Sequence, residues 1–98
     1  MDAVLIVDQR IIYSESAFAE IVVWELPKRL HGSTHDYKYR LAYVVDEVCV
    51  LRFDNEAGKG DHVHCGSTEG SYHFVSIDGL LADFSQYIQR WNHENGHL

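Results

Sequence analysis

A polar stretch near the middle of the chain, DNEAGKGDHVHCGS at residues 54–67, gathers residue types that could do chemistry. Its two histidines, His62 and His64, are two positions apart. On a β-strand that spacing puts both imidazoles on one face, roughly 7 Å apart at the backbone. Histidine titrates near neutral pH, so one ring could act as a general base while the other acts as a general acid.

The three residues shortly before this pair could hold an anion. Lys59 lies between Gly58 and Gly60, and glycines let backbone amides approach an anion closely. Two imidazoles and a cation beside such a loop are the groups that acid–base cleavage of RNA without a metal needs. In this hypothesis one of His62 and His64 takes the proton of the 2′-hydroxyl, the other protonates the departing 5′-oxygen, and Lys59 stabilises charge on phosphorus.

Two other interpretations of the stretch stay open. A glycine-rich hairpin with a solvated strand face needs no function at all. Alternatively, His62 and His64 could bind zinc together with Cys65 and His73, or a nuclease metal together with Asp61. The spacing of the zinc set matches no closed structural motif, so a site without metal or other cofactor is preferred.

Short strands and one helix must position this stretch. Residues rich in β-branched and aromatic side chains predict strands over 3–7, 10–13, 17–26, 37–45, 48–54 and 71–75. Asp46-Glu47 is expected to form a hairpin turn, although it lacks the usual glycine. From Ile77 to Trp91 apolar residues recur every three or four positions, which predicts an amphipathic helix capped by Ser76. The predicted fold class is α+β: an antiparallel β-sheet with one C-terminal amphipathic helix packed on a face.

The register of the predicted hairpin connects further charged side chains to the stretch. With a two-residue turn, Tyr39 faces Asp54 and Leu41 faces Arg52, so polar residues gather where the stretch begins. A single β-bulge would bring Arg40 into this group instead. Asp54 could orient an imidazole or cap the turn. The residues expected to bind substrate are Arg40, Arg52, Asp54, Asn55, Gly58 and Gly60.

Length and charge narrow the classes of function. Ninety-eight residues suit a single domain, 1–98, and the net charge is −7. An acidic surface suits a basic protein partner and matches nucleic acid only where basic residues gather locally. Two cysteines make no disulfide framework, and no apolar run approaches the roughly 20 residues that span a bilayer, so a cytoplasmic protein without membrane contact is expected. Cys49 is interpreted as a core thiol, and the histidines interpreted as surface residues are His31, His35, His93 and His97.

The order of the motifs resembles that of a known family. The motifs are Phe53-Asp54-Asn55, Gly58-Lys59-Gly60, His62-Val63-His64, Tyr72-His73-Phe74 and Asp83-Phe84. Over residues 40–84, nearly half of the chain, this succession resembles the TumE-type toxins of prokaryotic type II toxin–antitoxin modules. The resemblance implies a cognate helix-turn-helix-type antitoxin as partner, and growth arrest through cleavage of RNA.

The function predicted from the sequence is therefore that of a toxin acting as a metal-independent endoribonuclease on mRNA. His62 and His64 are the predicted acid–base pair, and Lys59 the predicted phosphate stabiliser. The alternative is a non-catalytic toxin or regulatory protein that acts by binding another protein. The oligomeric state stays open, with a homodimer among the states considered.

Overall fold

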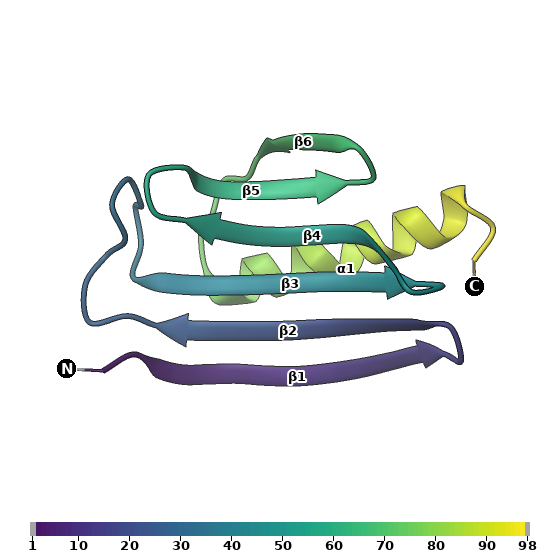
Figure 1. The fold of residues 1–98 in the computed structure, drawn as a ribbon, viewed down its shortest axis with the longest axis horizontal. Coiled ribbons are helices and arrows are strands. Elements are labelled where there is room, and N and C mark those ends of the chain that lie inside the picture. The colour runs from purple at the N-terminus through teal and green to yellow at the C-terminus, as the bar shows by residue number, and fades with distance from the viewer. Residues whose placement is uncertain (1, 98) are drawn as a thin grey trace.

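The computed structural model describes residues 2–97, and in this part of the chain it contains one six-stranded antiparallel sheet and one helix (Figure 1). The strands lie in the sheet in the order in which they occur in the chain. Because sheet neighbours are also chain neighbours, hairpin turns can make most of the connections. The strands are β1 (Val4–Ser14), β2 (Ala17–Glu25), β3 (Tyr37–Val45), β4 (Val48–Glu56), β5 (Gly60–Cys65) and β6 (Thr68–Ser71).

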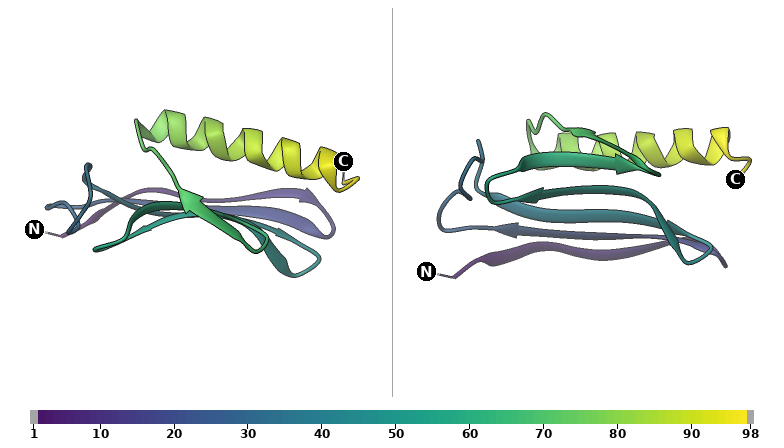
Figure 2. Two further views of the ribbon diagram at one scale, coloured as in Figure 1. Left: turned by 90° about the horizontal axis from the view of Figure 1, so that it is seen from above. Right: turned by 45° about the horizontal axis from the view of Figure 1, so that its top comes forward.

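The helix α1 (Ile77–Glu94) lies along one face of the sheet, as Figure 2 shows. Ser76 caps it, since its Oγ accepts a hydrogen bond from the backbone N–H of Gly79 at 3.0 Å. Three or four positions separate its buried residues, Leu80, Phe84, Ile88 and Asn92. The prediction of an α+β fold with a C-terminal helix packed on the sheet is confirmed. No helix within residues 2–97 combines the length and the apolar character needed to cross a membrane.

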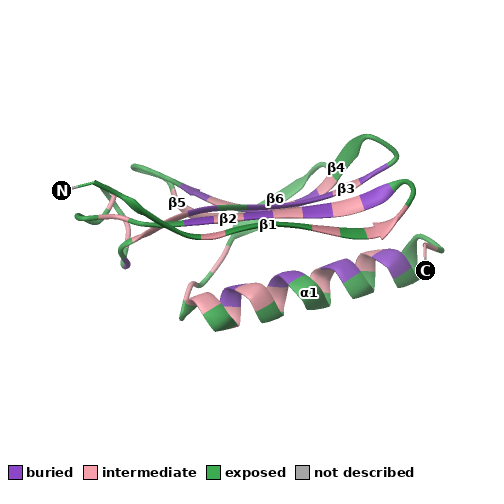
Figure 3. Ribbon diagram, turned by 90° about the horizontal axis from the view of Figure 1, so that it is seen from below, coloured by how far each residue is buried: buried purple, intermediate pink, exposed green. Residues whose placement is uncertain are grey.

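The core lies between α1 and the central strands. Figure 3 shows buried residues along β2 and β3 and on the side of α1 that is turned to the sheet. Phe53 is fully buried there and packs edge-on against Phe84, with ring centroids 5.7 Å apart. The opposite face of the sheet has no helix against it among the described residues, and we call it the open face.

The hairpin between β3 and β4 differs from the predicted register. Asp46 and Glu47 form the expected turn, both with positive φ (50° and 67°). A β-bulge then shifts the pairing between Val44 and Tyr43, so that Leu41 faces Phe53 instead of Arg52. The predicted register was wrong because it would have turned Arg52 toward the core, whereas the bulge buries Phe53. The alternative with one bulge is confirmed, and it places Arg40 opposite Asp54.

Three other strand predictions needed correction. The strands predicted at 3–7 and 10–13 are one strand, β1, which begins at Val4, because an edge strand accommodates the polar residues between them. Residues 71–75 are not a strand: β6 ends at Ser71, and the following residues lead into α1. The polar stretch at 54–67 is itself mostly strand, since it continues β4 and then forms β5.

Candidate functional site

The sheet register gathers six polar side chains on the open face. Asp54 of β4 lies opposite Arg40 of β3 on one side and opposite His62 of β5 on the other. Arg52 lies opposite His64, which in turn lies opposite Glu69 of β6. Directly opposed residues of an antiparallel pair point to the same face. We call this set the open-face group; its members are Arg40, Arg52, Asp54, His62, His64 and Glu69.

The two histidines of the open-face group are close together and accessible. Their ring centroids are 6.4 Å apart, and their side chains are 22% and 25% exposed. His62 donates a hydrogen bond from Nε2 to the carbonyl oxygen of Lys59 at 2.8 Å, and its Nδ1 is 3.4 Å from Glu69. The nitrogens of His64 lie 3.7 Å from Asp54 and 3.8 Å from Glu69. These last two distances are too long for hydrogen bonds, so a ligand could bond to the ring of His64.

The open-face group contains basic and acidic side chains. The Arg52 Nε contacts the Asp54 carboxylate at 3.0 Å, and both side chains are partly exposed. Arg40 is exposed on the neighbouring strand. Two arginines and two histidines thus gather on one face of a chain whose net charge is −7. The group contains the local basic residues that an acidic protein needs in order to bind a phosphate backbone.

In the turn between β4 and β5, which is predicted to hold an anion, two backbone amides donate to carbonyl oxygens of the chain. The N–H of Gly58 donates to the carbonyl oxygen of His31 at 2.7 Å, and the N–H of Lys59 donates to that of Glu56 at 3.2 Å. The Lys59 ammonium lies 3.7 Å from the Glu56 carboxylate. Gly58 and Gly60 both have positive φ (82° and 77°), a conformation that favours glycine. The two glycines therefore shape the turn, and two of its amides already have partners.

Asn55 does not join the open-face group, although it was predicted to bind substrate. Its side chain is 1% exposed and turned to the opposite face from Asp54. Its Oδ1 accepts from the backbone N–H of Tyr39 at 3.0 Å, and its Nδ2 donates to the carbonyl oxygen of Tyr37 at 2.7 Å. Asn55 thus takes the place of backbone hydrogen bonds where the pairing of β3 with β4 ends.

A second polar group is buried on the face that α1 covers. The Oδ2 of Asp61 accepts hydrogen bonds from the hydroxyl of Tyr39 at 2.6 Å and from Nε2 of His35 at 2.7 Å. The backbone N–H of Tyr37 donates to Nδ1 of His35 at 3.1 Å. Because Nδ1 is an acceptor, the ring proton is on Nε2. We call His35, Tyr39, Asn55 and Asp61 the buried group.

The buried group corrects the interpretation of His35 as a surface residue. His35 is 8% exposed, and its ring stacks on Phe74 with centroids 3.9 Å apart. Burial and then the hydrogen bond to Asp61 raise the pKa of Tyr39 far above its usual value near 10. Burial and then the hydrogen bond to Asp83 also raise the pKa of Tyr72. These hydroxyls stay protonated and act as fixed donors.

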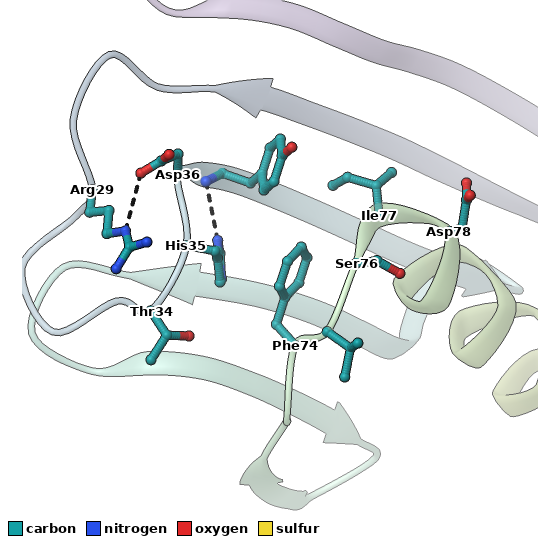
Figure 4. A pocket seen from close by; sticks show the side chains of 10 residues that line it. Arg29, Thr34, His35, Asp36, Phe74, Ser76, Ile77 and Asp78 are labelled. Carbon is teal, nitrogen blue, oxygen red and sulfur yellow. Dashed lines mark hydrogen bonds and ion pairs between the residues drawn. The ribbon is translucent and has the colours of Figure 1, made fainter.

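A hollow of about 410 Å³ adjoins the buried group, between the β2–β3 connection and the start of α1 (Figure 4). Of its three charged side chains, Arg29 and Asp36 pair with each other at 3.3 Å, and the third is Asp78 in the first turn of α1. His35 forms part of its wall, but both nitrogens of that ring already have partners. The hollow contains neither histidine of the open-face group. The open-face group is therefore the better candidate for chemistry.

Neither set of predicted alternative metal ligands comes together. Asp61 points to the buried side, away from His62 and His64. Cys65 follows His64 in the same strand, so its side chain points to the other face. Within residues 2–97, no three His, Cys, Asp or Glu side chains are arranged to hold a metal ion. Cys49, predicted to be a core thiol, is exposed.

Sequence reasoning missed Glu69 and the buried group. Glu69 lies in β6, which contains no apolar alternation that would predict a strand. The sequence did contain a signal for the buried group. Asp61 is the neighbour of His62 in the chain, and Asn55 is the neighbour of Asp54. In a strand such neighbours face opposite sides, so the polar stretch had to divide between the two faces.

A comparison with protein-family models matches residues 2–92 to the family described as Toxin TumE. Comparisons with curated proteins and with solved structures found no match. The family match extends beyond the motifs at residues 40–84 to the first strands and to most of α1. It confirms the resemblance inferred from those motifs, and the chain belongs to the TumE toxin family.

Proposed function

We propose that this protein, as the toxin of a toxin–antitoxin module, is a metal-independent endoribonuclease that cleaves mRNA. His62 and His64 are its acid–base pair. The observation that carries the proposal is the shared open face, on which both imidazoles lie in reach of a ligand beside Arg40 and Arg52. An open face also suits a polymeric substrate, since a strand of RNA can lie across β3 to β6 without entering a closed pocket.

The spacing of the two imidazoles suits one phosphodiester. An imidazole nitrogen has to come within about 3 Å of the oxygen that it serves. Rings whose centroids are 6.4 Å apart leave room for a phosphate between them. One ring takes the proton of the 2′-hydroxyl, whose oxygen then bonds to phosphorus. The P–O5′ bond breaks, and the other ring donates a proton to the 5′-oxygen, which leaves a 2′,3′-cyclic phosphate.

In this proposal Arg40 and Arg52 take the phosphate-stabilising role that was predicted for Lys59. Charge that develops on the phosphate oxygens needs a cation beside the two rings. The Lys59 ammonium lies at the β4–β5 turn beside Glu56, whereas Arg52 and Arg40 lie on the open face itself, where Arg52 also contacts Asp54. Arg52 and Arg40 are therefore the proposed phosphate-stabilising residues. Lys59, Gly58 and Gly60 remain peripheral contacts at the end of the substrate path.

Two replacements test the acid–base pair. Purified wild type, His62→Ala and His64→Ala are incubated with RNA, with His93→Ala as the matched control because His93 is an exposed histidine on α1. Loss of one acid–base group should lower the cleavage rate by at least about 100-fold. The control should retain the wild-type rate. Cleavage should persist in EDTA and leave 2′,3′-cyclic ends.

Other outcomes of this experiment would decide against the proposal. Growth arrest by wild type without any RNA cleavage would favour the non-catalytic toxin that binds a protein target. Activity that is lost in EDTA and restored by one divalent ion would favour a metal-dependent nuclease. Undiminished cleavage by both soluble alanine variants would remove the two histidines from the mechanism.

Membership of a toxin family implies an antitoxin partner, and we propose that a helix-turn-helix-type antitoxin covers the open-face group. Acidic or hydrogen-bonding side chains of the antitoxin would then lie where phosphate binds. Arg40→Glu inverts a charge at this contact and should weaken the complex at least tenfold in a titration. Arg90→Glu makes the same change on exposed α1 and should leave affinity unchanged. Equal affinity of both variants would place the antitoxin elsewhere.

A further inference from the structure

The first strand leaves a long apolar edge without a partner among residues 2–97. β1 pairs with β2 on one side only, and it lies at the edge of the sheet (Figure 1). It has 11 residues, whereas β6 at the opposite edge has 4. Of the seven exposed large hydrophobic residues within 2–97, four are in β1, namely Val4, Leu5, Ile6 and Ile12. A long unpaired edge with exposed apolar side chains can pair with another strand.

Two charges in the middle of β1 limit which strand could pair there. Asp8 and Arg10 flank Gln9, the central residue of Val4–Ser14. Charged residues on an edge strand usually discourage pairing. In an antiparallel pair of two β1 strands centred on Gln9, however, Asp8 of each copy lies opposite Arg10 of the other. Opposite charges at directly opposed positions stabilise a strand pair.

The neighbouring registers are unfavourable. Only alternate residues of an edge strand direct N–H and C=O to the free edge, so a symmetric antiparallel pair is centred on a residue. Centring on Asp8 would oppose the two copies of Asp8, and centring on Arg10 would oppose two arginines. The register centred on Gln9 also places Val7 opposite Ile11 in the regular middle of β1, between the two irregularities of its pairing with β2, at residues 5–7 and 12–14.

We propose that the β1 edge binds the β1 edge of a second copy of this chain, in the register centred on Gln9. The contact is isologous, as in a two-fold symmetric dimer. The two sheets then form one continuous sheet, with both α1 helices on one side. Both open-face groups lie together on the other side, so one surface presents two sites. This inference does not depend on what the open-face group does.

Three variants test the dimer by analytical ultracentrifugation over a concentration series at 0.15 M salt, where the repulsion between distant charges is screened beyond about 8 Å. Wild type should sediment as a dimer. Asp8→Lys places a lysine opposite Arg10, and Ile12→Lys adds a charge to the apolar edge; each should weaken dimerisation at least tenfold. Val48→Lys is the matched control, since Val48 is 60% exposed and Ile12 is 66% exposed. It should remain dimeric.

A compensating variant separates a specific contact from a folding defect. In D8K/R10E/E20K the opposed charges of the two copies are exchanged. Glu20→Lys keeps opposite charges at residues 10 and 20, which face each other across β1 and β2. Dimerisation should return toward the wild-type value. A wild type that stays monomeric throughout, or D8K and I12K dimers as tight as wild type, would overturn the proposal. The proposal would also be overturned if the wild-type chain is monomeric and I12K binds the antitoxin more weakly than wild type does, because the edge would then be a binding surface for the antitoxin.

Discussion

The polar groups on the two sides of β4 and β5 differ in how completely their hydrogen bonds are satisfied. In the buried group His35 has a partner at each ring nitrogen, at 2.7 and 3.1 Å. In the open-face group the nearest carboxylate oxygens to His64 lie at 3.7 and 3.8 Å. Both groups draw on the same polar stretch, because alternate residues of a strand face opposite sides. One side of the stretch stabilises the fold, and on the other side the His64 ring makes no hydrogen bond to another described residue.

The largest difference is expected from the two aspartates. Asp61→Ala leaves the Tyr39 hydroxyl and the His35 Nε2–H buried without an acceptor, which should lower the free energy of unfolding by about 3 kcal/mol. Asp54→Ala removes a partly exposed ion pair and should cost less than about 1 kcal/mol. Urea denaturation followed by circular dichroism compares the two. Equal losses would contradict the division into a buried and an open group.

A smaller difference is expected between the neighbours Asn55 and Glu56. Asn55→Ala removes two hydrogen bonds to the backbone of β3 and should destabilise the fold by about 2 kcal/mol. Glu56→Ala changes an exposed side chain and should stay within about 0.5 kcal/mol of wild type. Slower amide hydrogen exchange at Tyr39 in wild type than in Asn55→Ala would identify the lost bond. Unchanged exchange there would contradict the role given to Asn55.

A pH above 10 should lower the stability of the fold through the buried group and not through the open-face group. The raised pKa of Tyr39 means that the folded state favours the protonated phenol, chiefly because the side chain is buried. The resulting stabilisation is complete below pH 10 and is lost as the pH rises from 10 toward the pKa of the folded state. Unfolding titrations above pH 10 should therefore show falling stability, at most about 1.4 kcal/mol per pH unit for one tyrosine. Tyr39→Phe should show a shallower fall.

The smallest effect on stability is expected at the histidines of the open-face group. His64→Ala should change the free energy of unfolding by no more than about 0.5 kcal/mol, because its accessible ring makes no hydrogen bond to another described residue. His62→Ala should change it by no more than about 1 kcal/mol, because the ring gives up one exposed hydrogen bond, to the carbonyl oxygen of Lys59. His35→Ala should destabilise the fold more than either. Thermal melts of the three variants make this comparison with the same samples as the RNA assay. If His62→Ala greatly lowered the free energy of unfolding, its loss of cleavage activity would have to be attributed to a folding defect.

The helix and the central strands could be predicted from local patterns. Ile77 to Trp91 follow a helical period, and residues 37–45 are rich in β-branched and aromatic side chains. The hairpin register could not be predicted, since the bulge depends on whether Phe53 or Arg52 is buried, and that is a tertiary choice. β5 and β6 escaped prediction because their polar residues pair with a sheet that other segments build.

In the candidate site, too, local features could be predicted and tertiary contacts could not. The shared face of His62 and His64 could be predicted, because it depends only on the alternation of side chains in a strand. The position of the Lys59 ammonium beside the Glu56 carboxylate could not, since it depends on the shape of the β4–β5 turn. Nor could the burial of His35, which arises only when Phe74 and Asp61, distant in the sequence, pack against it.

The position of α1 after all six strands has a consequence for how the protein emerges from the ribosome. Residues such as Leu41 and Phe53 become covered only when Leu80, Phe84 and Ile88 have been made. At 5 to 20 residues per second, the 18 residues of α1 take about 1 to 4 s to synthesise. During that interval the sheet exposes its apolar face, and the nascent chain is open to proteases and chaperones. The apolar face of the sheet is therefore covered only after α1 has been made.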